Sequence, residues 1–398
     1  MRFDPWNPDF VAHPYRVYDE LRREAPVCWF EPTGQWLISR HADVNALLRD
    51  RRLGRSYLHA ATHEEFGRQP EPEFQEPFWR VIRAGMLDVE PPVHTRLRRL
   101  VSKAFTPRMV ESLRPRVRAI AAGLADTFVE KGGGDLLAEV AEPLPVTVIA
   151  EMLGIPDADR HLLRAWSADI CGMYELNPGI EAQHTAVRAA SEFAGYLKEL
   201  ARARRAAPGD DLISALTQIP ELTEDELVGT CVLLLNAGHE ATVNVTGNGW
   251  WALFRNSAEL ARLRADRSLL PTAVEELLRW DTPLQMFERW VLEDIEVHGV
   301  RIPRGSEVAL LFGSANRDPA VFDDPDRLDV GRADNPHISF GAGIHFCLGA
   351  PLARIELIES FGALLDRTAS LELREQPAWK PGYVIRGLHS LPLTATPA

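Results

Sequence analysis

The chain has 398 residues, with 44 lysines and arginines against 57 aspartates and glutamates, so its formal charge is −13. A composition of 45% hydrophobic and 25% charged residues is typical of a protein with a packed core, which excludes a disordered tail and a coiled rod. The acidic balance argues against nucleic-acid binding, because phosphate contacts need clustered Lys and Arg.

Residues 1–6 contain no basic segment followed by an apolar stretch, and the longest apolar run, Cys231 to Leu235, is far shorter than the roughly 20 residues of a membrane span. We therefore expect a cytoplasmic protein that does not bind a membrane. The four cysteines form no C-x-x-C pair and are predicted to be free thiols. No stretch is typical of a linker, so we expect a single domain over residues 1–398.

The first predicted elements are a hairpin and a short helix. Residues 27–30 and 36–39 flank Pro32-Thr33-Gly34, a sequence that favours a turn between two strands. A helix is predicted over residues 42–48.

A long loop and a helical region follow. Residues 56–90 are rich in Pro, Glu, Gly and aromatics without clear periodicity, which predicts a long, functional loop. Helical patterns dominate from His94 to about Arg205, interrupted by a loop at Gly132-Gly133-Gly134. Residues 56–90 and roughly 165–190 are expected to line an access channel.

The longest helical pattern begins at Thr223. Thr223 with Glu226 three residues later forms a capping box, and apolar residues follow at helical spacing. If the helix continues to Arg255 it is about 45 Å long, at roughly 1.5 Å per residue. A helix of that length must cross the core.

The last third of the chain alternates short elements with one irregular stretch. A helix is predicted over residues 268–280, and strands over 295–302 and 307–312. Residues 313–349 show no periodicity, and a helix with Pro351 in its first turn continues through Leu365. The whole sequence therefore predicts a mainly α fold with a minor β component.

Residues 340–349, Phe-Gly-Ala-Gly-Ile-His-Phe-Cys-Leu-Gly, place three glycines around Cys347. Glycines permit close backbone approach, so this loop can lie against a flat ligand while presenting the sulfur. The start of the next helix favours a thiolate, because its positive dipole end points at that sulfur. A thiolate beside a flat apolar group suggests an axial ligand to iron, although an isolated cysteine is more often a buried structural residue.

This segment resembles the haem-thiolate loop of the cytochrome P450 superfamily, F-G-x-G-x-H-x-C-x-G, and fills every fixed position of that pattern. Residues 276–279 resemble the E-x-x-R motif of the family, and Phe322 to Arg332 resembles the meander before the haem loop. The resemblance also reaches residues 237–240 and 91–98. It implies the cytochrome P450 fold, a triangular helix-rich prism with small β-sheets, of the bacterial, soluble, ferredoxin-dependent type.

The resemblance also implies a set of haem-binding residues. The cofactor would be haem b, iron protoporphyrin IX, with Cys347 as the metal ligand. His94, Arg98, Arg289 and His345 would hold the propionates, because planar carboxylates suit Arg forks and His donors. Phe340, Gly341 and Gly238 complete the predicted cofactor site.

Glu240, Ala241 and Thr242 form the predicted catalytic segment of the long helix. Gly238 would leave room for dioxygen above the iron, and Glu240 would deliver protons. The family pattern A-G-x-[DE]-T has Thr after the acid, whereas this chain has Ala241. Thr242 lies about 100° around the helix and cannot be assumed to replace the missing hydroxyl. Ordered water or a substrate hydroxyl would then complete the proton relay, or the chemistry makes weaker demands on oxygen activation.

Two electrons must come from outside, since the chain has no flavin or iron–sulfur segment. External ferredoxin and ferredoxin reductase are the expected donors. Residues 94–118 contain eight Lys and Arg against one acid, Glu111, so this stretch could attract an acidic ferredoxin, or be a solvated helix face.

The sequence thus predicts a monooxygenase that inserts one oxygen atom into a small organic substrate, such as a macrolide or other oxygen-rich natural product. Peroxide-driven oxidation or oxidative coupling is the alternative within enzymes, and a non-catalytic haem sensor or carrier is the alternative outside them. Two weaker motifs are rejected on context. Residues 247–252 match G-x-G-x-x-A but lie in a predicted helix, and His59 with His63 lacks the Glu of a zinc motif.

Overall fold

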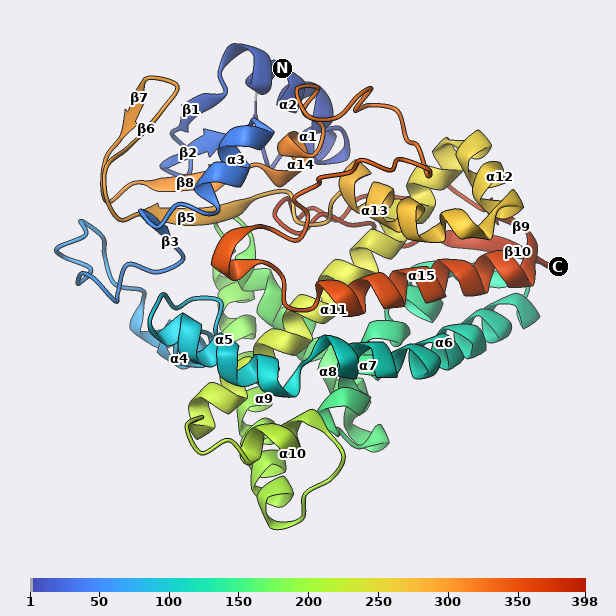
Figure 1. The fold of residues 1–398 in the computed structure, drawn as a ribbon, viewed down its shortest axis with the longest axis horizontal. Helices are drawn as coiled ribbons and strands as arrows, with labels where there is room; N and C mark the ends of the chain where they lie inside the picture. Colours follow the sequence, from blue (N-terminus) through green and yellow to red (C-terminus); the bar gives the residue numbers. More distant parts are fainter. Residues whose placement is uncertain (1–2) are drawn as a thin grey trace. The chain divides into compact units, whose positions relative to one another are not determined.

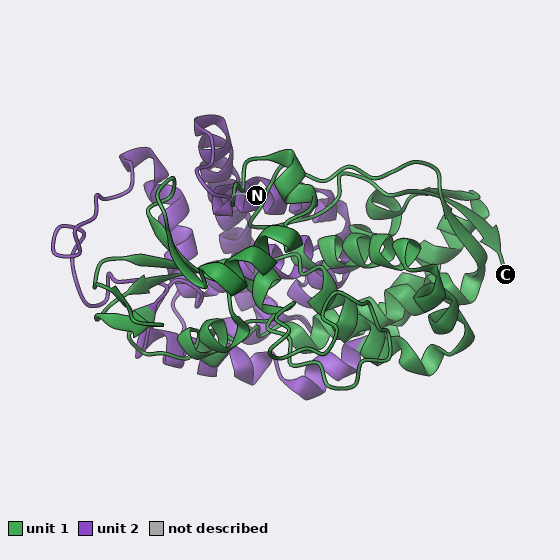
Figure 2. Cartoon of the chain, turned by 90° about the horizontal axis from the view of Figure 1, so that it is seen from above, with its two compact units in different colours: residues 1–53, 114–144, 241–398 green, residues 54–113, 145–240 purple. Residues whose placement is uncertain are grey.

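The computed structural model describes residues 3–398. They form two compact units, coloured separately in Figure 2. Unit 1 comprises the chain up to Leu53, Arg114–Leu144 and Ala241–Ala398, and unit 2 comprises Gly54–Leu113 and Pro145–Glu240. The single domain expected over the whole chain stays a prediction.

Helices dominate the described residues, as predicted (Figure 1). The α-helices are α1 Pro8–Ala12, α2 Tyr15–Glu24, α3 His41–Leu47, α4 Glu76–Ala84, α5 Val93–Ala104, α6 Pro107–Glu130, α7 Pro143–Leu153, α8 Arg160–Cys171, α9 Ile180–Ala206, α10 Leu212–Thr217, α11 Glu224–Arg255, α12 Ser257–Ala265, α13 Leu270–Trp280, α14 Phe312–Ala315 and α15 Ala350–Arg367.

The strands form small sheets. They are β1 Val27–Phe30, β2 Gln35–Ile38, β3 Leu53–Gly54, β4 Gly133–Asp135, β5 Phe287–Val291, β6 Ile295–Val297, β7 Val300–Ile302, β8 Glu307–Leu310, β9 Thr368–Leu373 and β10 Pro392–Pro397. The largest sheet has the order β1-β2-β8-β5-β3, and β4-β10-β9 and β6-β7 form the others. Strand β2 pairs in parallel with β8 and places Ile38 opposite Leu310, two residues that are fully buried in the core of unit 1.

Elements with strong local signals form where the sequence predicts them. The hairpin pairs β1 with β2, with Val27 opposite Ile38 and Gly34 in the turn at φ 66°. At the start of α11 the backbone N–H of Thr223 donates to Oε2 of Glu226 at 2.9 Å, and the N–H of Glu226 donates to Oγ1 of Thr223 at 3.2 Å. This reciprocal pair is the predicted capping box, and α11 extends to Arg255 as expected.

Two expectations need correction. The loop predicted over residues 56–90 contains α4, a helix with Pro77 in its first turn, where a missing N–H costs nothing. The glycines at 132–134 are not all loop, because Gly133 and Gly134 pair with Thr394 and Leu393 of β10. A side chain at Gly133 would overlap the backbone of Leu393, which explains why the strand is built from glycine.

Candidate haem-thiolate site

Cys347 lies in a tight loop of unit 1, immediately before α15. Figure 1 shows the segment that leads into α15 in orange-red. The loop closes through the N–H of Cys347, which donates to the carbonyl oxygen of Phe340 at 2.9 Å. Gly343 has φ 72°, and a Cβ there would overlap the carbonyl oxygen of Leu48, so only glycine fits without strain. Cys347 remains partly exposed at the end of this loop.

The ring of Phe340 is held by a charged network. The guanidinium of Arg354 lies 4.6 Å from the centroid of this ring and donates to Glu275 at 2.6 and 2.8 Å. Nε2 of His337 lies 3.0 Å from the same carboxylate, and Nδ1 of His337 accepts from the N–H of Ser339. Burial raises the pKa of Glu275, but the bonds from Arg354 and His337 outweigh it and lower the pKa to about 2. The sequence analysis missed this network.

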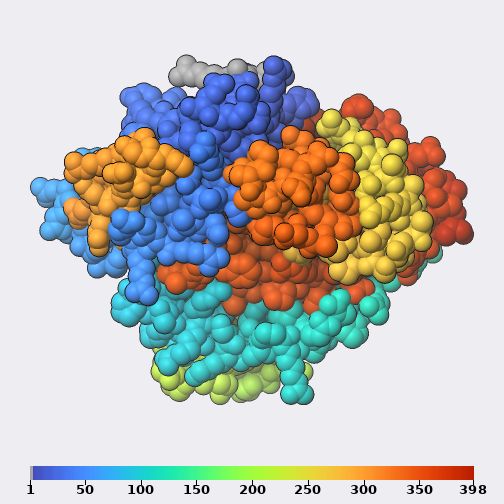
Figure 3. Space-filling view, turned by 45° about the horizontal axis from the view of Figure 1, so that its top comes forward, coloured from blue at the N-terminus to red at the C-terminus, as the bar shows by residue number. Residues whose placement is uncertain are grey.

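The predicted E-x-x-R motif forms a buried ion pair on α13. Glu276 and Arg279 are fully buried, and Arg279 donates to Glu276 at 2.7 and 2.8 Å. Glu276 also accepts from Nε of Arg332 at 3.1 Å and from Asn335 at 3.2 Å. The motif therefore fixes the segment that leads to the cysteine loop. Part of this meander, in orange, lies at the surface beside the yellow α12 in Figure 3. Nη1 of Arg262 on α12 donates to Oδ1 of Asp329 in the meander at 2.8 Å.

Unit 1 also holds two of the predicted propionate ligands. Arg289 is buried on β5, a strand that the sequence analysis missed; its Nη1 donates to the carbonyl oxygen of Glu288 at 2.8 Å, and its guanidinium lies 4.6 Å from the ring of Phe287. His345 ends a short 3₁₀ turn, Gly343–His345, in the cysteine loop and is partly exposed.

Unit 2 contains the other two residues that are predicted to hold the haem propionates. His94 and Arg98 lie four residues apart on α5, so they share one face of that helix. His94 is almost completely buried, whereas Arg98 is half-buried.

The middle of helix α11 contains several accessible residues among buried ones. Ala237 is exposed, and Gly238, Glu240 and Ala241 are partly exposed, whereas Thr242 is buried. The exposed faces of Ala237 and Ala241 recur every four residues, which places them on one side of the helix. That Thr242 does not replace the missing hydroxyl stays a prediction.

Gly238 has a packing reason of its own. A Cβ at this position would lie 2.6 Å from Cδ1 of Ile149, on α7. The glycine therefore permits the close approach of α7 to α11 within unit 2. That it also leaves room for dioxygen stays a prediction.

The basic stretch at residues 94–118 is partly neutralised. Arg96 pairs with Glu226, and Arg114 and Arg118 contact Glu359 at 3.3 and 2.8 Å. Those three cations are therefore committed to ion pairs within their units, so the surface available to an acidic partner is less basic than the sequence suggests.

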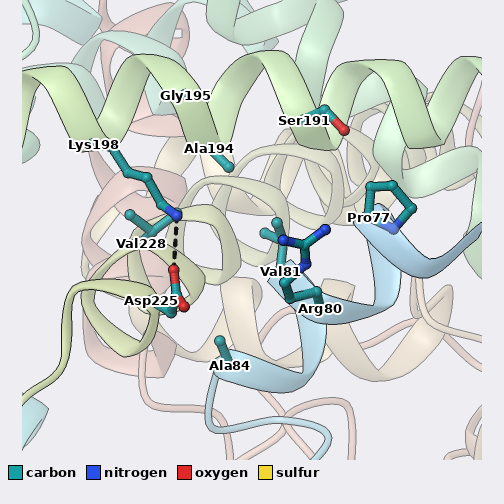
Figure 4. Close-up of a pocket in the computed structure, with 10 residues that line it drawn as sticks. All are labelled: Pro77, Arg80, Val81, Ala84, Ser191, Ala194, Gly195, Lys198, Asp225 and Val228. Atoms are coloured by element: carbon teal, nitrogen blue, oxygen red, sulfur yellow. Dashed lines mark ion pairs between the residues drawn. The ribbon is translucent and has the colours of Figure 1, made fainter.

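A groove of 240 Å³ lies among α4, α9 and α11 in unit 2 (Figure 4). Its walls are largely small and apolar, with Val81, Ala194 and Val228 among them, and Lys198 pairs with Asp225 at 2.8 Å on one side. None of the predicted haem-binding residues lines this groove.

The two motifs rejected in the sequence analysis, residues 247–252 and the pair His59 and His63, have structural settings that fit this rejection. Residues 247–252 lie within α11, and Nδ1 of His63 makes a 2.7 Å hydrogen bond with the hydroxyl of Tyr57. Within residues 3–398 no group of three or more His, Cys, Asp or Glu side chains is arranged to hold a metal ion. Over the same residues, every helix is too short or too polar to cross a membrane.

The structure brings together a mainly helical fold, a glycine-flanked cysteine before α15 and a buried Glu–Arg pair, as the resemblance to a haem-thiolate protein predicts. The cytochrome P450 family model matches residues 167–377. The chain is 40% identical to the cytochrome P450 monooxygenase PikC of Streptomyces venezuelae, over 97% of this chain and 92% of that protein. It is 39% identical to the 6-deoxyerythronolide B hydroxylase of Saccharopolyspora erythraea, over 95% of each chain.

A comparison with solved structures supports the same family. P450BioI, in complex with an acyl carrier protein ligated to hexadec-9Z-enoic acid, matches with a TM-score of 0.92 and 36% identity, over 97% of this chain and 100% of that chain. This chain therefore belongs to the cytochrome P450 family, and the predicted fold class is confirmed. Members of this family bind haem and receive electrons from redox partners.

Proposed function

We propose that this protein is a haem-thiolate monooxygenase that inserts one atom of dioxygen into a small, oxygen-rich organic substrate of secondary metabolism. The observation that carries the proposal is the loop that holds Cys347 partly exposed at the start of α15. The relatives support the reaction class, since their names describe a monooxygenase, a hydroxylase and an N-oxygenase.

The residues present fit haem b. The sulfur of Cys347, a partly exposed residue, would be the metal ligand, and the cationic or hydrogen-bonding side chains of His94, Arg98, Arg289 and His345 would hold the propionates. The Phe340 ring and Gly341 in the cysteine loop would lie against the macrocycle. The bound haem supplies the redox-active iron at which dioxygen is activated, and a thiolate ligand favours cleavage of its O–O bond.

Two features of the chain near Cys347 would favour its anionic form. Helix α15 begins directly after the loop, so the positive end of its dipole faces Cys347. The guanidinium of Arg354 is also close enough to Cys347 for the two to interact electrostatically. Arg354 is in turn fixed by Glu275. This arrangement favours a thiolate over a thiol.

Glu240 would deliver the protons that the reaction needs. The hydroxyl that the family pattern adds beside this acid is absent, because residue 241 is Ala. Glu240 is partly exposed on α11, so its carboxylate can exchange protons with water, and His239 lies 4.0 Å away. The methyl group of Ala241 leaves space where the family pattern has a Thr hydroxyl. Ordered water or a substrate hydroxyl would fill it, which suits an oxygen-rich substrate.

The remaining functional assignments rest on the family. External ferredoxin and ferredoxin reductase would supply the electrons, and the protein would act in the cytoplasm. The name of one relative, the 6-deoxyerythronolide B hydroxylase, gives 6-deoxyerythronolide B as the compound it hydroxylates, and we infer a macrolactone as the substrate class of this chain.

Turnover in ¹⁸O₂ tests the proposal. The purified holoenzyme, supplied with NADPH, a ferredoxin and its reductase, is incubated with a set of macrolactones, and products are analysed by mass spectrometry. We expect a product that carries one ¹⁸O atom and that depends on NADPH. Product formed only with added peroxide, coupled product without ¹⁸O, or no product from any macrolactone would contradict the proposal.

A further inference from the structure

Three side chains lie near the Phe340 ring in the cysteine loop. The guanidinium of Arg354, on α15, lies 4.6 Å from the centroid of this ring, and the rings of His337 and Phe346 lie at 5.9 and 6.4 Å. The carbonyl oxygen of Phe340 accepts the N–H of Cys347 at 2.9 Å. The position of Phe340 is therefore coupled to that of the cysteine through a hydrogen bond.

One carboxylate holds Arg354 in this place. Nε and Nη2 of Arg354 donate to the two oxygens of Glu275, on α13, at 2.6 and 2.8 Å, and this forked geometry fixes the plane of the guanidinium. Oε2 of Glu275 also lies 3.0 Å from Nε2 of His337. Nδ1 of His337 accepts from the N–H of Ser339 at 3.2 Å, so this nitrogen carries no proton and Nε2 is the donor. Glu275 is therefore bonded to one cation and one ring N–H.

Neutral hydrogen bonds already anchor the segment before the cysteine loop. The hydroxyl of Ser339 donates to the carbonyl oxygen of Leu278 on α13 at 2.8 Å, and Nδ2 of Asn316 donates to the same hydroxyl at 2.8 Å. The side chains of Glu275 and Arg354 are 26% and 36% exposed. An ion pair with that exposure adds little stability, so the charges themselves call for a functional explanation.

The charge of Arg354 interacts with the sulfur. The bonds to Glu275 raise the pKa of Arg354, burial lowers it, and the charges of Glu275 and Cys347 raise it further. Because this attraction is mutual, the guanidinium stabilises negative charge on the cysteine, whereas the carboxylate of Glu275 has the opposite effect. All of these residues belong to unit 1.

We propose that Arg354 and Glu275 are positioning residues that set the reduction potential of the haem iron bound by Cys347. The inference rests on the proposed function and deepens it. Bound haem gains one negative charge when its iron takes up one electron, and a nearby cation stabilises that added charge. Arg354 therefore raises the potential, and Glu275, which fixes Arg354 and opposes its field, limits the rise. The competing explanation is that the pair only anchors α15 to α13.

Removal of each charge should shift the potential in opposite directions. The potentials of the holoenzymes are measured without substrate, by titration with dithionite in the presence of redox dyes. Arg354→Gln should lower the potential by about 59 mV, a tenfold change in the equilibrium constant for one-electron reduction, because a carboxylate without its cation remains near the cysteine. Glu275→Gln should raise the potential by a similar amount, because the cation then lacks its counter-charge. Arg354→Lys keeps the charge and should leave the equilibrium constant within about twofold of the wild type.

Arg267 provides the matched control. Its side chain is 33% exposed, against 36% for Arg354, and its Nε donates to Asp366 at 2.9 Å. It also donates to three backbone carbonyl oxygens, so its structural role is at least as large. Asp366 lies 12 residues beyond Arg354 on α15, about 18 Å along the helix. Arg267→Gln should therefore lower the thermal midpoint but leave the equilibrium constant for reduction within about twofold.

The inference is overturned if Arg354→Gln and Glu275→Gln shift the potential in the same direction, or if either leaves it unchanged. It is also overturned if Arg354→Lys or Arg267→Gln lowers the potential as far as Arg354→Gln. Should Arg354→Gln not retain haem, the absence of a rise in Glu275→Gln overturns the inference by itself.

The reduced carbon monoxide difference spectrum separates this failure from that of the proposed function. A thiolate-shifted Soret band in the wild type, with potentials that do not move, refutes only the role of Arg354 and Glu275. Absence of that band from the haem-loaded wild type refutes the proposed function.

Discussion

Removing the charge of Glu276 should destabilise the protein strongly. Glu276 is 0% exposed and neutralises Arg279, which is equally buried, while also accepting from Arg332. In the Glu276→Gln variant, the neutral amide of the new Gln side chain would face the guanidinium groups of Arg279 and Arg332, and neither would keep a negative charge from residue 276. Breaking a buried ion pair by removing one partner costs about 3–5 kcal/mol, because the remaining charge stays desolvated.

This cost converts into a measurable shift in the thermal midpoint. Unfolding entropy is about 2.1 cal/mol/K per residue, or roughly 0.8 kcal/mol/K for a chain of this length, so the midpoint should fall by about 4–6 °C. Glu199→Gln is the control, since Glu199 pairs with Arg202 at 2.7 Å while both side chains are more than half exposed. An exposed pair is worth about 0–1 kcal/mol, which predicts a change of about 1 °C or less.

The thermal midpoints of the wild type, Glu276→Gln and Glu199→Gln are compared by differential scanning calorimetry at the same pH and the same haem content. The same samples should show that Glu276→Gln loses haem at a lower temperature, because Glu276 anchors the segment that leads to the cysteine loop. Equal midpoints for the two variants would refute the reasoning that burial, rather than the number of ion pairs, sets the energy.

Further predictions concern the cysteine loop and α11. The pKa of Glu275 is lowered to about 2 from 4.5, so its charge stabilises the fold above about pH 4.5 and this contribution is lost as the pH falls toward 2. Glu275→Gln should therefore flatten the fall of the thermal midpoint over that range, and an unchanged slope would contradict the assignment. Gly343→Ala should cost about 1–3 kcal/mol, since it forces a side chain to φ 72° against Leu48, and haem retention on a desalting column should fall. Gly123→Ala, in the open on α6, is its control and should stabilise by about 0.5–1 kcal/mol. Ala241→Thr should raise the product formed per NADPH for substrates that lack a hydroxyl near the oxidised carbon, and no gain would argue against the missing proton donor.

The sequence predicted those elements that are determined by residues close together in the chain. The hairpin at β1 and β2 needs only alternating residues around a turn, and the capping box at Thr223 and Glu226 is made by two residues three apart. The cysteine loop was predicted for the same reason, since its glycines and Cys347 are contiguous.

Contacts between distant segments could not be predicted in this way. Helix α4 was missed because its proline and acidic residues resemble a loop until Pro77 is seen as a first-turn residue. Strand β5 was missed because its pairing with β8 depends on residues 17 to 23 positions away. Glu275 and Arg354 are 79 residues apart, and nothing in either segment indicates that they meet.

The central claim is that a thiolate from Cys347 binds the haem iron, and the reduced carbon monoxide difference spectrum tests it most directly. The wild type should show the thiolate-shifted Soret band, and Cys347→Ser should lose it while the thermal midpoint of the haem-free protein is unchanged. Persistence of the shifted band in Cys347→Ser, or its absence from the haem-loaded wild type, would contradict the account.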